Sequence, residues 1–223
     1  KDLCIQFDND GKQDTAVNCA SFSVGAGELV AIVGESGSGK SVTALSILQL
    51  LPKQTTVKGE IIFNNGKPES LLQLTEKKIT GFRGNKIAMI FQEPMTSLNP
   101  VFTCGYQVME AIRLHEAVTR EIAKQKTIKL FEQLNLPNPE SLLSRYPHEL
   151  SGGQKQRVMI AMAMSCNPSL LIADEPTTAL DVTVQKKILE LIRLLQQQNG
   201  MGVMLITHDL GVVADIADKI IVM

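Results

Sequence analysis

The chain has 223 residues, of which 44% are hydrophobic and 20% are charged, and its formal net charge is −1. This size suits one large α/β domain, or one core with an inserted subdomain. A charge so near zero creates no overall field that would attract nucleic acid or anionic lipid. The four cysteines form no Cys-x-x-Cys pair, which argues against a zinc or iron–sulfur site and favours a reducing compartment.

No apolar run approaches the length of a membrane span, and we expect no signal peptide. The chain begins at Lys1 without a methionine and ends inside a strand-like run at 219–223. We therefore expect it to be a piece of a longer protein.

Short apolar or alternating runs predict strands in the first part of the chain. These strands are expected at 3–7, 17–24, 29–33, 57–63 and 87–91. Asn9-Asp10-Gly11-Lys12 is a strong hairpin turn between the first two. The apolar positions of 42–51 predict a helix, and a short helix is expected at 71–80.

The middle of the chain has helical periodicity and no strand signal. Apolar residues recur at helical spacing through 101–136, and charged and amide side chains fill the other faces. We therefore expect two or three helices between Gln92 and Pro147. The predicted organisation is an N-terminal core part at 1–94, an inserted helical subdomain at 95–147 with a further helix to about 165, and a C-terminal core part at 148–223 that lacks its end.

In the last third of the chain, apolar runs alternate with helical segments. Strands are expected at 170–173, 203–207 and 220–223, and helices at 151–164 and 183–198. This alternation predicts an α/β fold with a mostly parallel sheet and helices on both faces, next to an antiparallel N-terminal β part. Functional residues gather at the carboxyl ends of such strands. The polar or glycine residues that fall there are Gly34, Gln92, Asp174, Glu175 and His208.

The most informative stretch is Gly-Glu-Ser-Gly-Ser-Gly-Lys-Ser at 34–41, between a buried strand and a helix. It matches the P-loop, in which glycines let the backbone curl around a phosphate chain and aim its N–H groups at the anion. Lys40 can reach the β- and γ-phosphates, and the Ser41 hydroxyl suits Mg²⁺. The residues assigned to nucleotide binding here are Gly34, Glu35, Ser36, Gly37, Ser38, Gly39, Lys40, Ser41 and Val42.

Five further motifs follow the P-loop in order: a glutamine that ends a strand, Leu-Ser-Gly-Gly-Gln, an apolar run with Asp-Glu, Ala-Leu-Asp, and a histidine that ends a strand. This ordered set resembles the ATP-binding cassette (ABC) ATPase domain over nearly the whole chain. The resemblance implies a P-loop NTPase core with an inserted helical subdomain, and ATP and Mg²⁺ as cofactors.

The resemblance assigns a role to each strand-end residue. Asp174 helps to hold Mg²⁺ through water, and adjacent Glu175 polarises the attacking water as general base. His208 hydrogen-bonds the γ-phosphate, and Lys40 acts with these residues in catalysis. Gln92 contacts Mg²⁺ or water and couples the nucleotide to the helical insert. Phe7 either stacks on adenine or faces the core, and the sequence leaves both interpretations open.

A second small-residue turn, Ser151-Gly152-Gly153-Gln154, also opens a helix. In the resembled family this turn contacts the ATP that a second subunit binds, so two domains sandwich two ATP molecules. Asp181 would lie at the same dimer interface, and it also suits the N-cap of the following helix.

The stretch 91–100 and the Tyr-Pro-His-Glu-Leu segment at 146–150 resemble the oligopeptide/dipeptide/nickel branch of ABC importers. That branch implies an ATPase subunit on the cytoplasmic face of a bacterial or archaeal membrane, powering uptake of peptides or a related small solute. The partners would be two membrane permeases, a second ABC ATPase subunit, identical or homologous, and indirectly an extracytoplasmic solute-binding protein.

Three other functions remain as alternatives. A P-loop GTPase or kinase-like switch is disfavoured because Asn85-Lys86 is not followed by the aspartate that reads guanine. A soluble ABC-type ATPase that acts on nucleic acid or the ribosome is disfavoured by the near-neutral charge, and we expect no nucleic-acid partner. A degenerate ATP-holding subunit is disfavoured by the intact Lys40, Asp174, Glu175 and His208.

Overall fold

The computed structural model describes residues 1–9, 12–92, 97–178 and 180–223. The predicted hairpin turn at 9–12, the stretch that follows Gln92 and the Ala-Leu-Asp motif therefore lie partly outside the described residues. Within them, no helix combines the length and apolar character that crossing a bilayer requires.

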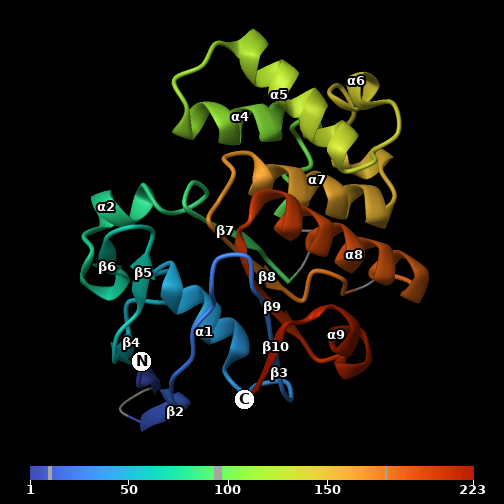
Figure 1. Ribbon diagram of the computed structural model, residues 1–223. Helices are drawn as coiled ribbons and strands as arrows, with labels where there is room; N and C mark the ends of the chain where they lie inside the picture. The colour runs from blue at the N-terminus through green and yellow to red at the C-terminus, as the bar shows by residue number, and fades with distance from the viewer. Residues whose placement is uncertain (10–11, 93–96, 179) are drawn as a thin grey trace.

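The centre of the fold is a five-stranded parallel sheet (Figure 1). In spatial order its strands are β10 (Lys219–Val222), β3 (Leu29–Val33), β9 (Gly202–Thr207), β8 (Leu170–Asp174) and β7 (Ile87–Ile90). All five residues of β3 are buried, as expected for a parallel strand covered on both faces. The predicted strands of the sheet are confirmed to within one residue at each end.

Helices cover both faces of this sheet, and alternate strand residues divide between the two layers. On one face, α1 (Lys40–Ile47) packs on Ile172, Met204 and Ile206. On the other face, Leu171, Ala173 and Leu205 join the core formed with the longer helices. The helices of that second layer are α7 (Gly152–Met164), α8 (Val182–Asn199) and α9 (Leu210–Ile216). This arrangement confirms the predicted P-loop NTPase core.

An antiparallel β part flanks the core near the N-terminus (Figure 1). It contains the three-stranded sheet β2 (Lys12–Ala20), β1 (Leu3–Asn9) and β4 (Thr55–Lys58), and the hairpin of β5 (Ile62–Asn64) and β6 (Pro68–Ser70). The second strand begins earlier than predicted because its pairing with β1 runs back to Asn9 and Lys12.

Two predicted elements of this region are each divided in the structure. The strand expected at 57–63 is interrupted at Gly59, whose φ of 101° is a left-handed conformation that ends β4. The helix expected at 71–80 is divided at Thr75, whose extended backbone separates a short 3₁₀ turn from the next helix. The two pieces are η1 (Leu71–Gln73) and α2 (Glu76–Thr80).

A group of helices lies at one end of the molecule, above the sheet in Figure 1. It contains α4 (Cys104–His115), α5 (Arg120–Gln133), α6 (Pro139–Leu142) and the 3₁₀ turn η2 (Pro147–Glu149). Thr103 and Thr119 cap α4 and α5 by accepting backbone N–H groups. Fully buried Phe131 belongs to the cluster that joins these helices to α7. The expected helical insert is confirmed, whereas α9 was not predicted; its Val213 packs on Ala31 and Val33 of β3.

Candidate nucleotide site

The carboxyl ends of the central strands lie level with one another. Val33 of β3 pairs with Thr207 of β9, and Asp174 of β8 pairs with Ile206 of β9. Because β3, β9 and β8 are neighbours in that order, the segments after them reach the same edge of the sheet. This edge carries the P-loop, the Asp174-Glu175 pair and His208, as the sequence predicted.

The P-loop is compact, and two of its positions accept no side chain. Gly39, the residue before α1, has a φ of 93°, and a Cβ there would lie 2.5 Å from the Ala16 carbonyl oxygen of β2. A Cβ on Gly34 would lie 2.2 Å from the carbonyl oxygen of Met223. Close backbone approach from two directions therefore requires glycine at both ends of the loop.

Lys40 lies inside this loop. Its Nζ donates hydrogen bonds to the carbonyl oxygens of Gly34 at 2.9 Å and Glu35 at 2.6 Å, and to Ser38 Oγ at 3.2 Å. The residue is only 6% exposed. A buried ammonium group needs oxygen partners, and the loop supplies three of them on the side where a phosphate would sit. These bonds fix the Lys40 ammonium group within the P-loop.

Asp174 and Ser41 form a pair of oxygen donors beside the loop. Ser41 Oγ donates to Asp174 Oδ1 over 3.0 Å, and Asp174 is 4% exposed. Burial and the neighbouring charge of Glu175 raise the pKa of Asp174, although the Ser41 hydrogen bond and Lys40 oppose this shift. A carboxylate and a hydroxyl are the oxygen ligands that Mg²⁺ prefers, so these residues fit the ion that the sequence predicted.

Glu175 is held by three side chains from three segments. Thr178 Oγ1 donates to Oε2 over 2.9 Å, Gln92 Nε2 donates to the same oxygen over 3.2 Å, and His208 Nδ1 lies 3.3 Å from Oε1. Burial alone would raise the pKa of Glu175, but the hydrogen bonds from Thr178, His208 and Gln92 outweigh it and lower the pKa. The carboxylate is therefore ionised at neutral pH.

The backbone of Glu175 is also unusual. Its φ is 45°, a left-handed conformation that a glutamate rarely adopts, and its N–H donates to Ile206 of the adjacent strand β9. Strained backbone of this kind is concentrated at functional sites, where the surrounding structure holds it in place. The strain turns the carboxylate out of strand β8, toward Gln92 and His208.

Thr178 is the residue that the sequence analysis missed. It lies three residues after Glu175, and its N–H also donates to the Glu175 carbonyl oxygen in a tight turn. A hydroxyl three positions after an acidic residue, directly after a strand, is the sequence signal that could have identified it.

The turn at 151–154 lies at the start of α7 and forms a capping box. Ser151 Oγ accepts from the backbone N–H of Gln154, and the Gln154 side chain accepts from the N–H of Ser151. A Cβ on Gly153 would lie 2.9 Å from Val184 of α8, so this turn packs against the start of α8. Asp181 caps that helix by accepting from Val184 N–H.

The Ser151 turn and Asp181 do not bond the P-loop within this chain. Ser151, Gly152 and Asp181 are exposed, and none of the hydrogen bonds found among the described residues joins them to Lys40 or Asp174. The structure therefore does not bring the Ser151 turn into the cluster around Glu175 within this chain.

Phe7 lies on β1 and is half-buried. It packs with Val42 of α1 against the small cluster of Leu3, Ile5 and Val17. This packing supports the core-facing interpretation of Phe7, and adenine stacking stays a prediction.

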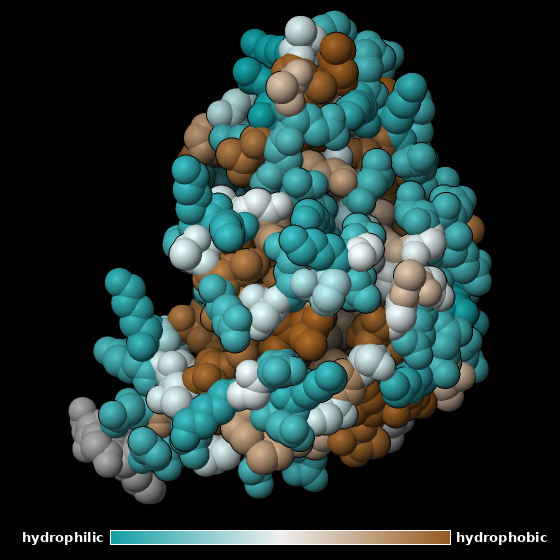
Figure 2. All heavy atoms as spheres, turned by 60° about the vertical axis from the view of Figure 1, so that its left-hand side comes forward, coloured by the Kyte–Doolittle hydropathy of each residue, from teal (hydrophilic) through white to brown (hydrophobic). Residues whose placement is uncertain are grey.

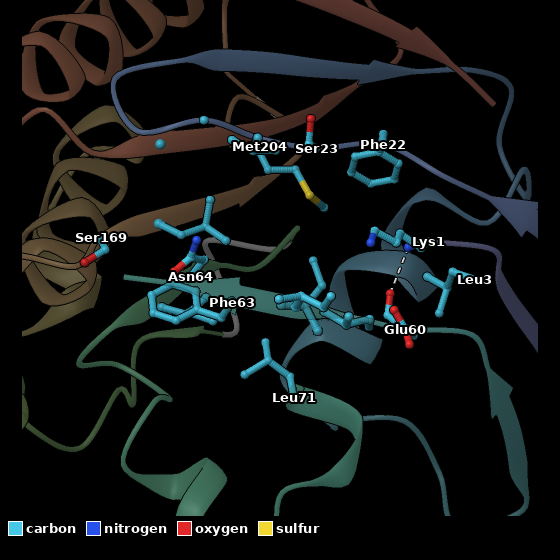
Figure 3. A pocket seen from close by; sticks show the side chains of 18 of the residues that line it. Lys1, Leu3, Phe22, Ser23, Glu60, Phe63, Asn64, Leu71, Ser169 and Met204 are labelled. Carbon is cyan, nitrogen blue, oxygen red and sulfur yellow. Dashed lines mark hydrogen bonds between the residues drawn. The ribbon is translucent and has the colours of Figure 1, made fainter. Parts of the chain in front are cut away.

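A separate pocket of about 490 Å³ lies at the opposite ends of the strands (Figure 3). Leu170 and Gly202, which begin β8 and β9, line it together with Phe63 of β5. Figure 3 shows Met204 and Leu71 pointing into the same space. The P-loop lies at the other ends of these strands, so this pocket is not the phosphate site.

Together the fold and this edge define a nucleotide-binding P-loop domain. The family model described as ABC transporter matches residues 17–178. The glutathione import ATP-binding protein GsiA of Salmonella paratyphi A is 53% identical over 225 residues, which cover 99% of this chain and 36% of that protein. The peptide ABC transporter ATP-binding protein y4tR of Sinorhizobium fredii is 54% identical over 225 residues, which cover 100% of this chain and 66% of that protein.

A solved structure supports the same assignment. The dimeric post-hydrolysis state of the ATP-binding cassette MJ0796 bound to ADP and Pi matches with a TM-score of 0.85 and 29% identity, covering 100% of this chain and 92% of that one. The chain belongs to the ABC transporter family. It spans 36% of the length of GsiA and 66% of that of y4tR.

The opposite pKa shifts of the two carboxylates lead to a prediction about their hydrogen bonds. Ser41→Ala removes the bond that lowers the pKa of Asp174, so this pKa should rise further. Thr178→Val removes a bond that lowers the pKa of Glu175, so that pKa should rise toward its ordinary value. Carboxyl ¹³C NMR titration measures both. Ser46→Ala on α1 is the control, because the Ser46 hydroxyl bonds only the Thr43 carbonyl oxygen among the described contacts.

The raised pKa of Asp174 makes the stability of the fold depend on pH. The folded state binds the Asp174 proton more tightly than the unfolded chain, so Asp174 lowers the free energy of unfolding as pH rises above its ordinary pKa of 3.8. Ser41→Ala should extend this loss to higher pH. An unchanged Asp174 pKa in that variant would contradict the hydrogen bond.

Proposed function

We propose that this chain binds ATP at the P-loop and hydrolyses it with Glu175 as general base. The observation that carries the proposal is the position of Glu175. Its ionised carboxylate is held by Thr178, Gln92 and His208, and it directly follows Asp174, which bonds Ser41 of the P-loop. An ionised, fixed carboxylate can accept a proton from water in the transition state. Its orientation by three donors is what a positioned base requires.

The other residues of this edge take the remaining roles. Lys40 exchanges its loop oxygens for phosphate oxygens, and the start of α1 adds its dipole. Ser41 and Asp174 would hold Mg²⁺, which neutralises charge on the triphosphate when bound. His208, whose side chain is 70% exposed, is free to hydrogen-bond a terminal phosphate while it contacts Glu175. Gln92 follows β7 and leads toward the helical insert.

Glu175→Gln tests this assignment. The amide keeps the shape of the side chain but accepts no proton, so ATP hydrolysis should fall about 10²- to 10⁴-fold while nucleotide binding persists. Glu190→Gln, on the exposed side of α8, is the matched control. Hydrolysis is measured by phosphate release, and binding by a fluorescent ATP analogue. Undiminished turnover in the Glu175 variant would show that another group is the base.

We further propose that each nucleotide site is completed by the Ser151 turn of a second ABC subunit. This turn is exposed at the start of α7, which leaves the positive end of a helix dipole available to an anion. Exposed Asp181 caps α8 beside it. The similar MJ0796 cassette is described as dimeric with bound ADP and Pi, which supports the same assembly here. The second subunit would be a copy of this chain or a homologous ABC subunit.

A composite site predicts that hydrolysis depends on protein concentration. Activity per molecule should rise as the protein is concentrated, because only the dimer has complete sites. Ser151→Asp keeps a side-chain oxygen for the Gln154 N–H but places a carboxylate in the exposed turn, so it should remove that rise. Lys186→Glu, an exposed change of charge on α8, is the control. Equal activity per molecule in a dilute, proven monomer would contradict the composite site.

We propose that this protein is the energy-supplying subunit of an importer for peptides or a related small solute. Relatives named for glutathione import and for peptide transport, at 53% and 54% identity, support this assignment. The subunit would lie on the cytoplasmic face of the membrane, under two permeases that receive solute from an extracytoplasmic binding protein. The nucleic-acid or ribosome alternative has no such support among these relatives.

An apolar groove is the proposed docking surface for a permease. Its volume is about 380 Å³, and it lies between the end of α1, strand β7, and helices α4 and α7. Its residues include Leu50, Met89, Phe91, Met159 and Met162. Leu50 is 39% and Phe91 44% exposed, and the flexible methionines adapt to a partner surface. Figure 2 shows one face of the molecule, on which apolar side chains (brown) are exposed among polar ones.

The expected occupant is an amphipathic helix on the cytoplasmic side of the permease. A helix places its apolar residues into such a groove, and Phe91 lies next to Gln92, so movement there can reach Glu175. Leu50→Asp should weaken permease binding about tenfold or more, measured by co-purification from membranes. Leu194→Asp, at an equally exposed position of α8, is the control. Equal loss in both variants would argue against this groove.

A further inference from the structure

Two cysteines meet on neighbouring strands, away from the nucleotide site. Cys4 lies on β1 and Cys19 on β2, and their Sγ atoms are 3.0 Å apart. Both are free thiols; Cys19 is exposed and Cys4 half-buried. Cross-strand neighbours at this distance need little movement to form a disulfide.

The backbone around the pair departs from regular strand geometry. Leu3 pairs with Ala20 and Ile5 with Val17, so two residues of β2 stand opposite Cys4 in a β-bulge. Cys19 has a φ of 51° at this bulge, a left-handed conformation that favours glycine or asparagine. A cysteine in that place directs its sulfur to Cys4, and an outlier of this kind is grounds for a functional hypothesis.

Hydrogen bonds hold the two sulfurs next to each other. The backbone N–H of Cys19 donates to Cys4 Sγ over 3.2 Å, and Cys4 Sγ in turn donates to the Asp2 carbonyl oxygen over 3.6 Å. The side-chain hydrogen bond between the two cysteines is the largest cause that raises the pKa of Cys19. Asp2 contributes a further, smaller charge nearby.

The other two cysteines have no such arrangement. Cys104 is fully buried, and burial raises its pKa to about 11. Cys166 is half-buried, burial raises its pKa, and it contacts the Ser165 hydroxyl and the Ala111 carbonyl oxygen. Cys4 and Cys19 are therefore the two described cysteines whose sulfurs lie close enough to form a disulfide, and Cys19 is exposed to a small-molecule oxidant.

We propose that Cys4 and Cys19 form a reversible redox site that closes to a disulfide by exchange with a small-molecule disulfide. One cysteine of the pair loses its proton and attacks one sulfur of that disulfide, and the S–S bond breaks to release one thiolate. The other cysteine then loses its proton and attacks the first protein sulfur, which releases the second thiolate. Two protein thiols are oxidised and one small disulfide is reduced to two thiols, so electrons and protons balance.

The position of the link gives it a structural effect. The disulfide would tie β1 to β2 across the bulge, two residues from Val17. The Val17 side chain packs closely against the P-loop at Gly39, where an added Cβ would lie 2.8 Å from Val17 Cγ2. Oxidation would therefore restrain the strand that supports the P-loop from outside. A cross-link of this kind reduces the conformational freedom of the unfolded chain and slows local opening of the sheet.

Peptide mapping of the full-length protein tests the proposal directly. The protein is equilibrated at several ratios of reduced to oxidised glutathione, its remaining thiols are alkylated at low pH, and it is digested with trypsin. Cleavage after Lys1, Lys12 and Lys40 puts Cys4 in peptide 2–12 and Cys19 in peptide 13–40. The expected result is a covalent 2–12/13–40 pair that increases with oxidised glutathione and disappears with dithiothreitol.

Two variants make the result specific. Cys19→Gly keeps the bulge, because glycine adopts its positive φ without strain, and should abolish the linked pair while the fold persists. Cys166→Ser removes a half-buried cysteine outside the pair and should leave the link unchanged. Wild-type protein that gives only single mixed disulfides with glutathione, or no modification at Cys4 and Cys19 in excess oxidised glutathione, would overturn the proposal.

Discussion

The parallel register of β3, β9 and β8 is the constraint on which the nucleotide site depends. Hydrogen bonding between neighbouring parallel strands ends them at one level, so residues far apart in sequence leave the sheet side by side. A strand slipped by one residue would turn its side chains to the other face of the sheet. Leu171 and Ala173 are buried in one helical layer and Ile172 in the other. A slip would move each of these side chains out of its own core cluster, so this packing opposes it.

Two consecutive carboxylates acquire different chemistry from this arrangement. Asp174 ends the strand with its side chain buried against Ser41, and burial raises its pKa. Glu175 leaves the sheet through a left-handed turn into a set of donors that lowers its pKa. Environment rather than residue type separates a group suited to a metal from one suited to accept a proton.

Gln92 connects this chemistry to the rest of the molecule. Its amide donates to Glu175, and the preceding Phe91 lines the apolar groove beside the helical insert. The helices of the insert share one buried cluster with α7, whose first turn is the exposed Ser151 turn. A change at the carboxylate can therefore reach both the groove and the α7 turn through packed elements.

The sequence alone determined the strands of the central sheet, the P-loop and the helical insert, because apolar periodicity and glycine spacing are local properties. It did not predict α9, the break at Gly59 or Thr178, since these depend on which strand or side chain lies opposite. The roles of the site residues stay predictions, although the structure brings Gln92 and His208 to Glu175 and pairs Ser41 with Asp174. Only the tertiary structure decided that Cys4 meets Cys19 and that Asp174 and Glu175 shift in opposite directions, because burial and hydrogen-bond partners come from distant segments.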